Sequence, residues 1–137
     1  MQSEHLGNVH PGWVLGGWLV AIATTSATFL VLVGTGMVGP ERQDALGFGV
    51  AVAVGFFAAG LFVGLRWSEA PILHAVALTL TSIVVLLAID LTGAGRGFAA
   101  AESVPVALAT LLIQFAAAAL GGRMGRRMVS GRVGAGG

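Results

Sequence analysis

The stretch AAGLFVGLRWSEAPILHA, residues 58–75, decides the fold because it joins two long apolar runs through a short polar turn. Arg66 and Trp67 are a cation and an indole of the kind found at the surface of a bilayer. Ser68 can cap a following helix, and Pro71 suits the first position of that helix. The stretch therefore predicts the tight turn of an antiparallel helical hairpin in a membrane.

The composition of the whole chain agrees with a membrane location. Of its 137 residues, 56% are hydrophobic and only 9% are charged, whereas soluble domains contain roughly 25% charged residues. A hydrocarbon core about 30 Å thick needs roughly 20 apolar residues per helix. We therefore expect an all-α, polytopic membrane protein, a bundle of four transmembrane helices that run up, down, up and down with short loops. The predicted helices occupy residues 13–38, 46–65, 72–91 and 104–120.

These helices leave no room for a soluble domain. We expect a cytoplasmic N-terminal segment at residues 1–12, a four-helix transmembrane domain at 13–121, and a basic cytoplasmic tail, partly disordered, at 122–137. The pair Gly121 and Gly122 is predicted to end the last helix, because glycine is a poor helix former.

Arginine distribution predicts the orientation. All seven basic residues are arginine, and five of them, Arg66 and four in the C-terminal tail, fall on one predicted side of the membrane, while Arg42 and Arg96 fall on the other. The positive-inside rule then places both termini in the cytoplasm. A basic segment mixed with apolar residues is typical of contact with anionic lipid. The predicted lipid-headgroup contacts are Arg66, Arg123, Arg126 and Arg127.

Small residues recur at helical spacing in the second predicted helix. In lipid, helices associate through close backbone approach, which small residues four positions apart permit. Such surfaces pack either within one chain or between copies, and the sequence leaves both open. The predicted packing residues are the ladder Gly47, Ala51, Gly55 and Ala59, and the GxxxG pair Gly60 and Gly64.

A few polar residues lie within the apolar runs, and they have two interpretations. They can line a hydrated path, or they can make interhelical hydrogen bonds worth about 0.6 kcal/mol each. Asp90 is the only acid in a predicted span, and it lies roughly 27 Å along its helix, near the outer interface. The residues of the possible transport path are Asp90, Thr79, Ser82, Gln114 and Thr110.

Motifs for other chemistry are absent from the sequence. It has no cysteine, no paired carboxylates, no HExxH and no Walker glycine loop. We therefore expect no enzymatic activity, no cofactor, no metal site and no nucleic-acid partner.

Residues 47–125 resemble a family of small, uncharacterised, four-helix prokaryotic membrane proteins described as YrzE-like. The resemblance lies in the glycine-rich AAGLFVGLR, in EAPILHAVALTLTSIVV and in the closing AAAALGGRMG. It implies the same four-helix fold and a prokaryotic inner (cytoplasmic) membrane, and it implies no activity.

Together these patterns predict an integral membrane protein that acts through helix packing, as a homo-oligomer or as a subunit of a larger membrane complex. The alternative is a small ion or solute transporter or channel, with Asp90 and the polar helix residues lining its path.

Overall fold

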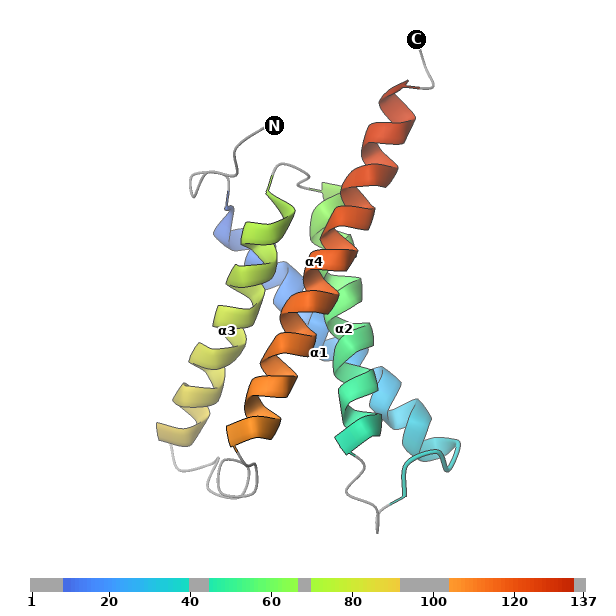
Figure 1. Ribbon diagram of the computed structural model, residues 1–137, viewed down its shortest axis with the longest axis vertical. Helices are drawn as coiled ribbons and strands as arrows, with labels where there is room; N and C mark the ends of the chain where they lie inside the picture. The colour runs from blue at the N-terminus through green and yellow to red at the C-terminus, as the bar shows by residue number, and fades with distance from the viewer. Residues whose placement is uncertain (1–8, 40–44, 67–69, 92–103, 135–137) are drawn as a thin grey trace.

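The computed structural model describes residues 9–39, 45–66, 70–91 and 104–134, and these residues form four α-helices. Successive helices run in opposite directions, so the start of α1 and the end of α4 lie at the same end of the protein (Figure 1). The prediction of an all-α, four-helix fold is confirmed. The helices are α1 (Pro11–Gly34), α2 (Ala45–Arg66), α3 (Pro71–Leu91) and α4 (Val104–Gly134).

Three helices are long and apolar enough to cross a membrane. Within the described residues these segments are Pro11–Gly34, Leu46–Arg66 and Pro105–Gly131, while α3 contains a shorter apolar segment, Pro71–Val85. A span needs roughly 17 to 25 apolar residues, so α1, α2 and α4 meet this requirement. The protein is thus a small helical protein with several segments suited to lipid.

Helix α1 ends four residues before its predicted end at Val38. It stops at Gly34 because Gly36 takes a left-handed conformation with φ of 72°. The N–H of Gly36 donates to the carbonyl of Val33 at 3.0 Å. Such a bond occupies one of the carbonyls left unpaired at a helix end, and glycine takes the conformation without a steric penalty.

Helix α4 extends well beyond its predicted end at residue 120. It continues through Gly121 and Gly122 to Gly134, so most of the segment predicted as a tail is helical. A helical glycine costs about 1 kcal/mol relative to alanine, but these two glycines lie against α2 and α3, where the lack of a side chain allows close packing. The 31 residues of α4 span about 46 Å, and its last turns extend past the other helices (Figure 1).

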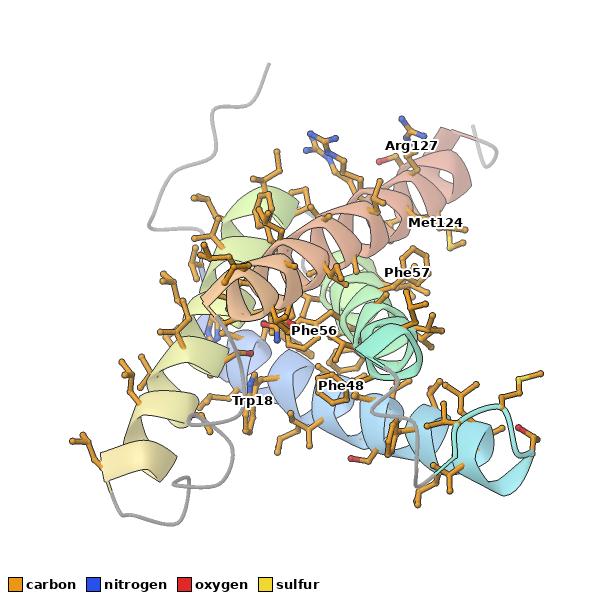
Figure 2. The ribbon with its side chains drawn as sticks, turned by 60° about the horizontal axis from the view of Figure 1, so that its bottom comes forward. Trp18, Phe48, Phe56, Phe57, Met124 and Arg127 are labelled. Carbon is orange, nitrogen blue, oxygen red and sulfur yellow. The ribbon has the colours of Figure 1, made fainter. Side chains whose placement is uncertain are left out.

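Helix α2 is the centre of the bundle. In its apolar span 39% of residues are buried in the protein, against 17% in α1 and 22% in α4. Phe56, on α2, is 3% exposed, and it lies among the helices in Figure 2. Helix α2 packs most extensively on α4 and next on α1. The buried cluster comprises Val14, Ala21, Val52, Phe56, Ala59, Ala75, Leu78, Ala117 and Ala118.

Candidate functional site

The closest helix contact joins α2 to α4, with no side chain between the two backbones. A Cβ built on Gly60 would lie 2.8 Å from Cα of Ala118, and a Cβ on Gly64 would lie 2.9 Å from Cα of Gly122. Distances this short exclude any side chain at these positions of α2 unless the helices move apart. We call this contact the α2–α4 seam, which consists of Gly60, Gly64, Ala118, Gly121, Gly122 and Gly125.

The α4 side of this seam also depends on glycine. A Cβ on Gly121 would lie 2.8 Å from the backbone nitrogen of Leu61, and a Cβ on Gly125 would lie 2.7 Å from the carbonyl oxygen of Leu61. The sequence analysis did not assign these two glycines to packing. Their spacing of four residues in GGRMG is the signal that could have identified them.

A second close contact joins α1 to the opposite side of α2. A Cβ on Gly55 would lie 2.6 Å from the carbonyl oxygen of Ala21, and a Cβ on Gly17 would lie 2.8 Å from Cγ2 of Val63. Gly17 and Ala21 are four residues apart, which is the pattern that the sequence analysis overlooked in α1. We call this contact the α1–α2 seam, which consists of Gly17, Ala21, Thr25, Gly55, Ala59 and Val63.

The packing residues predicted on α2 therefore lie in different surroundings. Gly55 faces α1, whereas Gly60 and Gly64 face α4, all within one chain. In the other part of the ladder, Ala51 is buried and Gly47 is half-buried.

Most polar side chains of the predicted transport path, where the structure describes them, make hydrogen bonds within the helix bundle. The indole Nε1 of Trp18 donates to Oγ of Ser82 at 3.3 Å, which links α1 to α3; Figure 2 shows Trp18 on the side of α1 that faces α3. The hydroxyls of Thr79 and Thr110 donate to carbonyls four residues earlier in their own helices, at 3.0 and 2.9 Å. These contacts are typical of hydroxyls in membrane helices. The side chain of Asp90 lies outside the described residues.

Among the described residues, three side chains carry a buried atom without a hydrogen bond, and they are Thr25, His74 and Gln114. Oε1 of Gln114 has no partner, and the residue is 7% exposed. His74 is 1% exposed, with Nδ1 2.8 Å from the carbonyl oxygen of Ala70 and with Nε2 unpartnered. Across the part of the chain that the structure describes, no three His, Asp or Glu side chains lie together as they would in a metal site.

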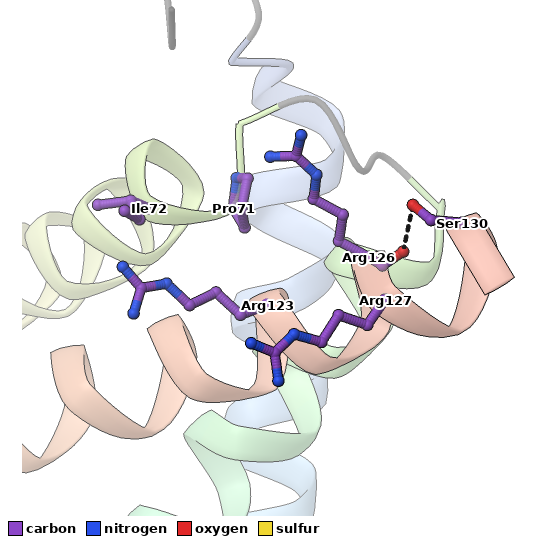
Figure 3. A pocket seen from close by; sticks show the side chains of 6 residues that line it. All are labelled: Pro71, Ile72, Arg123, Arg126, Arg127 and Ser130. Atoms are coloured by element: carbon purple, nitrogen blue, oxygen red, sulfur yellow. Dashed lines mark hydrogen bonds between the residues drawn. The ribbon is translucent and has the colours of Figure 1, made fainter. Parts of the chain in front are cut away.

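Arginine side chains gather beside the start of α3. They line an open surface pocket of about 460 Å³ between α3 and α4. In Figure 3 the side chain of Arg123 extends toward Ile72 and that of Arg126 toward Pro71. Of the four predicted headgroup arginines, three lie here, and Arg66 is exposed at the end of α2 outside the cavity lining. We call this cavity the arginine pocket, which is lined by Pro71, Ile72, Arg123, Arg126, Arg127 and Ser130.

No known protein family, curated protein or solved structure matches the chain. The YrzE-like resemblance therefore stays a prediction.

Proposed function

We propose that this protein is a non-enzymatic membrane protein that acts through its outer helix surfaces, as a homo-oligomer or as a subunit of a larger membrane assembly. The observation that carries the proposal is the exposure of large apolar side chains. Leu19 and Leu30 of α1 are 63% and 69% exposed, and Leu112 of α4 is 68% exposed. Apolar patches of this kind mark surfaces that lipid or another protein covers.

The proposed membrane arrangement has four crossings with both termini in the cytoplasm. Helix α3, at 21 residues, is about 31 Å long, which matches the hydrocarbon thickness of about 30 Å. Arg66 ends α2, and the arginine pocket lies on α4 at the same end of the bundle (Figure 1). The clustering of these cations at one end supports a cytoplasmic position for that end. The YrzE-like resemblance would make the membrane a prokaryotic inner membrane.

The assembly surface, under this proposal, lies away from the glycine seams. Both seams are occupied by helices of the same chain, and a second copy cannot use Gly60 while Ala118 covers it. The exposed outer faces of the helices remain, among them those of α1 and α4. These faces carry leucine and valine, and contacts between them in lipid would depend on side-chain packing.

Cysteine cross-linking in native membranes tests the assembly. The chain has no cysteine, so single substitutions Leu19→Cys, Leu30→Cys and Leu112→Cys introduce unique thiols on outer faces. We expect a bifunctional maleimide to yield, from at least one position, a product of twice the chain mass for a homo-oligomer, or of another defined mass for a different subunit. Uncrosslinked chain from all three positions would contradict the proposal. Glu4→Cys, in the predicted N-terminal segment, is the control for random collision.

Thiol labelling tests the orientation. Met128→Cys lies in the last turns of α4, where the native side chain is 42% exposed. We expect a membrane-impermeant maleimide to label this variant only after the cells are permeabilised, because the positive-inside rule places this end in the cytoplasm. Arg42→Cys, in the predicted outer loop, should label in intact cells. The opposite pattern would reverse the topology.

A transporter or channel is the second candidate. It is favoured by Gln114, whose buried Oε1 lacks a hydrogen bond, since polar groups that face a hydrated path are bonded by water. Cation flux into proteoliposomes separates the two functions. Asp90→Asn would abolish the flux of a transporter, and under the packing proposal the variant and the native protein show the same background flux.

A further inference from the structure

Three arginine side chains line the arginine pocket, with no acidic side chain beside them among the described residues, and from this we infer that it is a binding site for a phosphate group. Arg123, Arg126 and Arg127 are three and four residues apart, so they lie on one face of α4. Like charges at this spacing repel each other. An anion held among them would relieve that repulsion.

The pocket is framed by two helices in firm contact. A Cβ on Gly122 would lie 3.1 Å from Cβ of Pro71, so the start of α3 rests directly on α4. Pro71 is buried, which keeps this wall in place. The start of α3 also presents the positive end of its helix dipole, which has the same sign as the arginines opposite.

The chemistry of the lining residues favours phosphate among anions. The planar guanidinium of arginine matches two phosphate oxygens at once, and the pocket lining supplies three such groups. Ser130 lies on the rim, and its hydroxyl donates to the carbonyl oxygen of Arg126 at 3.1 Å (Figure 3). The volume of about 460 Å³ lies within the range of roughly 300 to 1,000 Å³ for small-ligand pockets. It is large enough for a phosphate with a small substituent.

Either a lipid headgroup or a soluble phosphate compound could supply this group. The pocket lies where the apolar segment of α3, Pro71–Val85, begins, which is the depth of lipid headgroups if α3 crosses the membrane. Met124 and Met128, in the same turns of α4, are 45% and 42% exposed, and exposed apolar side chains of this kind suit contact with acyl chains. The lipid source rests on the proposed membrane arrangement, whereas the phosphate site does not.

Native mass spectrometry of the full chain in mild detergent tests the lipid source. We expect one phosphatidic acid to be retained per chain in preference to phosphatidylcholine. Arg123→Gln and Arg127→Gln should each weaken retention about tenfold, the usual effect of losing a charge-assisted hydrogen bond. Arg42→Gln, in the predicted outer loop, is the matched control, because it removes the same charge from a position that is not a predicted headgroup contact, and it should retain phosphatidic acid as the native chain does.

Calorimetry with pyrophosphate in the same detergent tests the soluble source. Pyrophosphate binding that Arg123→Gln weakens, without retention of phosphatidic acid, would assign the site to a soluble phosphate compound. Binding of neither probe would overturn the inference. An equal loss in Arg42→Gln and Arg123→Gln would also overturn it, since the effect would then follow net charge and not the pocket.

A carboxylate of the same chain is the rival occupant. Glu69 precedes Pro71 by two residues and lies outside the described residues. If the probes bind only to Glu69→Gln and not to the native chain, the pocket belongs to that carboxylate and the inference fails. The outcome is independent of the cross-linking test. Phosphate binding without cross-links would contradict the proposed assembly and support the phosphate site. Cross-links without phosphate binding would support the assembly and contradict the phosphate site.

Discussion

Gly60→Leu is expected to prevent α2 and α4 from packing within a single chain. Any Cβ at this position would lie 2.8 Å from Cα of Ala118, and backbone cannot rotate away as a side chain can. Overpacking typically costs about 1 to 3 kcal/mol and occasionally more, and a leucine against backbone belongs at the upper end. We expect the thermal unfolding midpoint in mild detergent to fall by roughly 10 °C or more.

The matched control is Gly131→Leu. Gly131 lies in α4, and a Cβ there would meet nothing within 4 Å. We expect this variant to unfold within a few degrees of the native chain, with a slight gain because leucine is a better helix former than glycine. If Gly60→Leu instead keeps the native midpoint and changes only the molecular mass in detergent, Gly60 contacts a second copy and the assignment of the seam to one chain is wrong.

The helix boundaries that the sequence predicted well are those marked by local chemistry. Helix α2 was predicted at 46–65 and occupies Ala45–Arg66, and α3 was predicted at 72–91 and occupies Pro71–Leu91. None of these ends differs from its prediction by more than one residue. Proline suits the first position of a helix, and an uninterrupted apolar run has few alternatives to helix in lipid because unpaired backbone groups are costly there. Local signals therefore suffice for these two helices.

The C-terminal end of α4 could not be predicted from local sequence, because it depends on tertiary contacts. Gly121 and Gly122 would favour a helix end in water, but here their hydrogens face α2 and the start of α3. The choice between a helix end and a packing surface depends on whether another helix lies opposite, which no local pattern reports. The same reason explains why the sequence predicted the headgroup arginines but not the pocket, since Pro71 is close to Arg123 and Arg126 only in three dimensions.

The sequence also could not indicate which helix packs on each glycine face of α2. Gly55 and Gly60 are five residues apart, which turns them about 140° from each other around the helix. The spacing indicates two separate faces on α2. It does not indicate that α1 covers Gly55 and α4 covers Gly60, as the structure shows, because that assignment depends on which helices cross and at what angle.

These two faces allow a second substitution to separate α1 from the rest of the bundle. Gly55→Leu is expected to displace α1 while α2 and α4 stay packed. Its Cβ would lie 2.6 Å from the carbonyl oxygen of Ala21 and 3.0 Å from the backbone nitrogen of Thr25, so the clash is again with backbone. Helix α1 contacts α3 much less than α2, and the hydrogen bond from Trp18 to Ser82 is a weak substitute at about 0.6 kcal/mol.

Two engineered cysteine pairs measure the two seams separately. A Cβ on Gly16 would lie 3.9 Å from Cε1 of Phe62, and a Cβ on Gly49 would lie 3.9 Å from Cδ1 of Ile113, so Gly16→Cys with Phe62→Cys reports on α1 and α2, and Gly49→Cys with Ile113→Cys reports on α2 and α4. With a short bifunctional maleimide, we expect Gly55→Leu to reduce cross-linking of the first pair at least tenfold and to leave the second pair unchanged.

The control for this experiment is Gly34→Leu at the end of α1, where a Cβ would meet nothing within 4 Å. This variant makes the same glycine-to-leucine change at a position on α1 that does not contact α2, so both pairs should cross-link as in the native background. If Gly55→Leu abolishes both cross-links, the bundle folds as one unit and α1 is required for the α2–α4 seam. If it abolishes neither, α1 can shift along α2 to accommodate leucine. Only selective loss of the first pair agrees with two seams that form independently on opposite faces of α2.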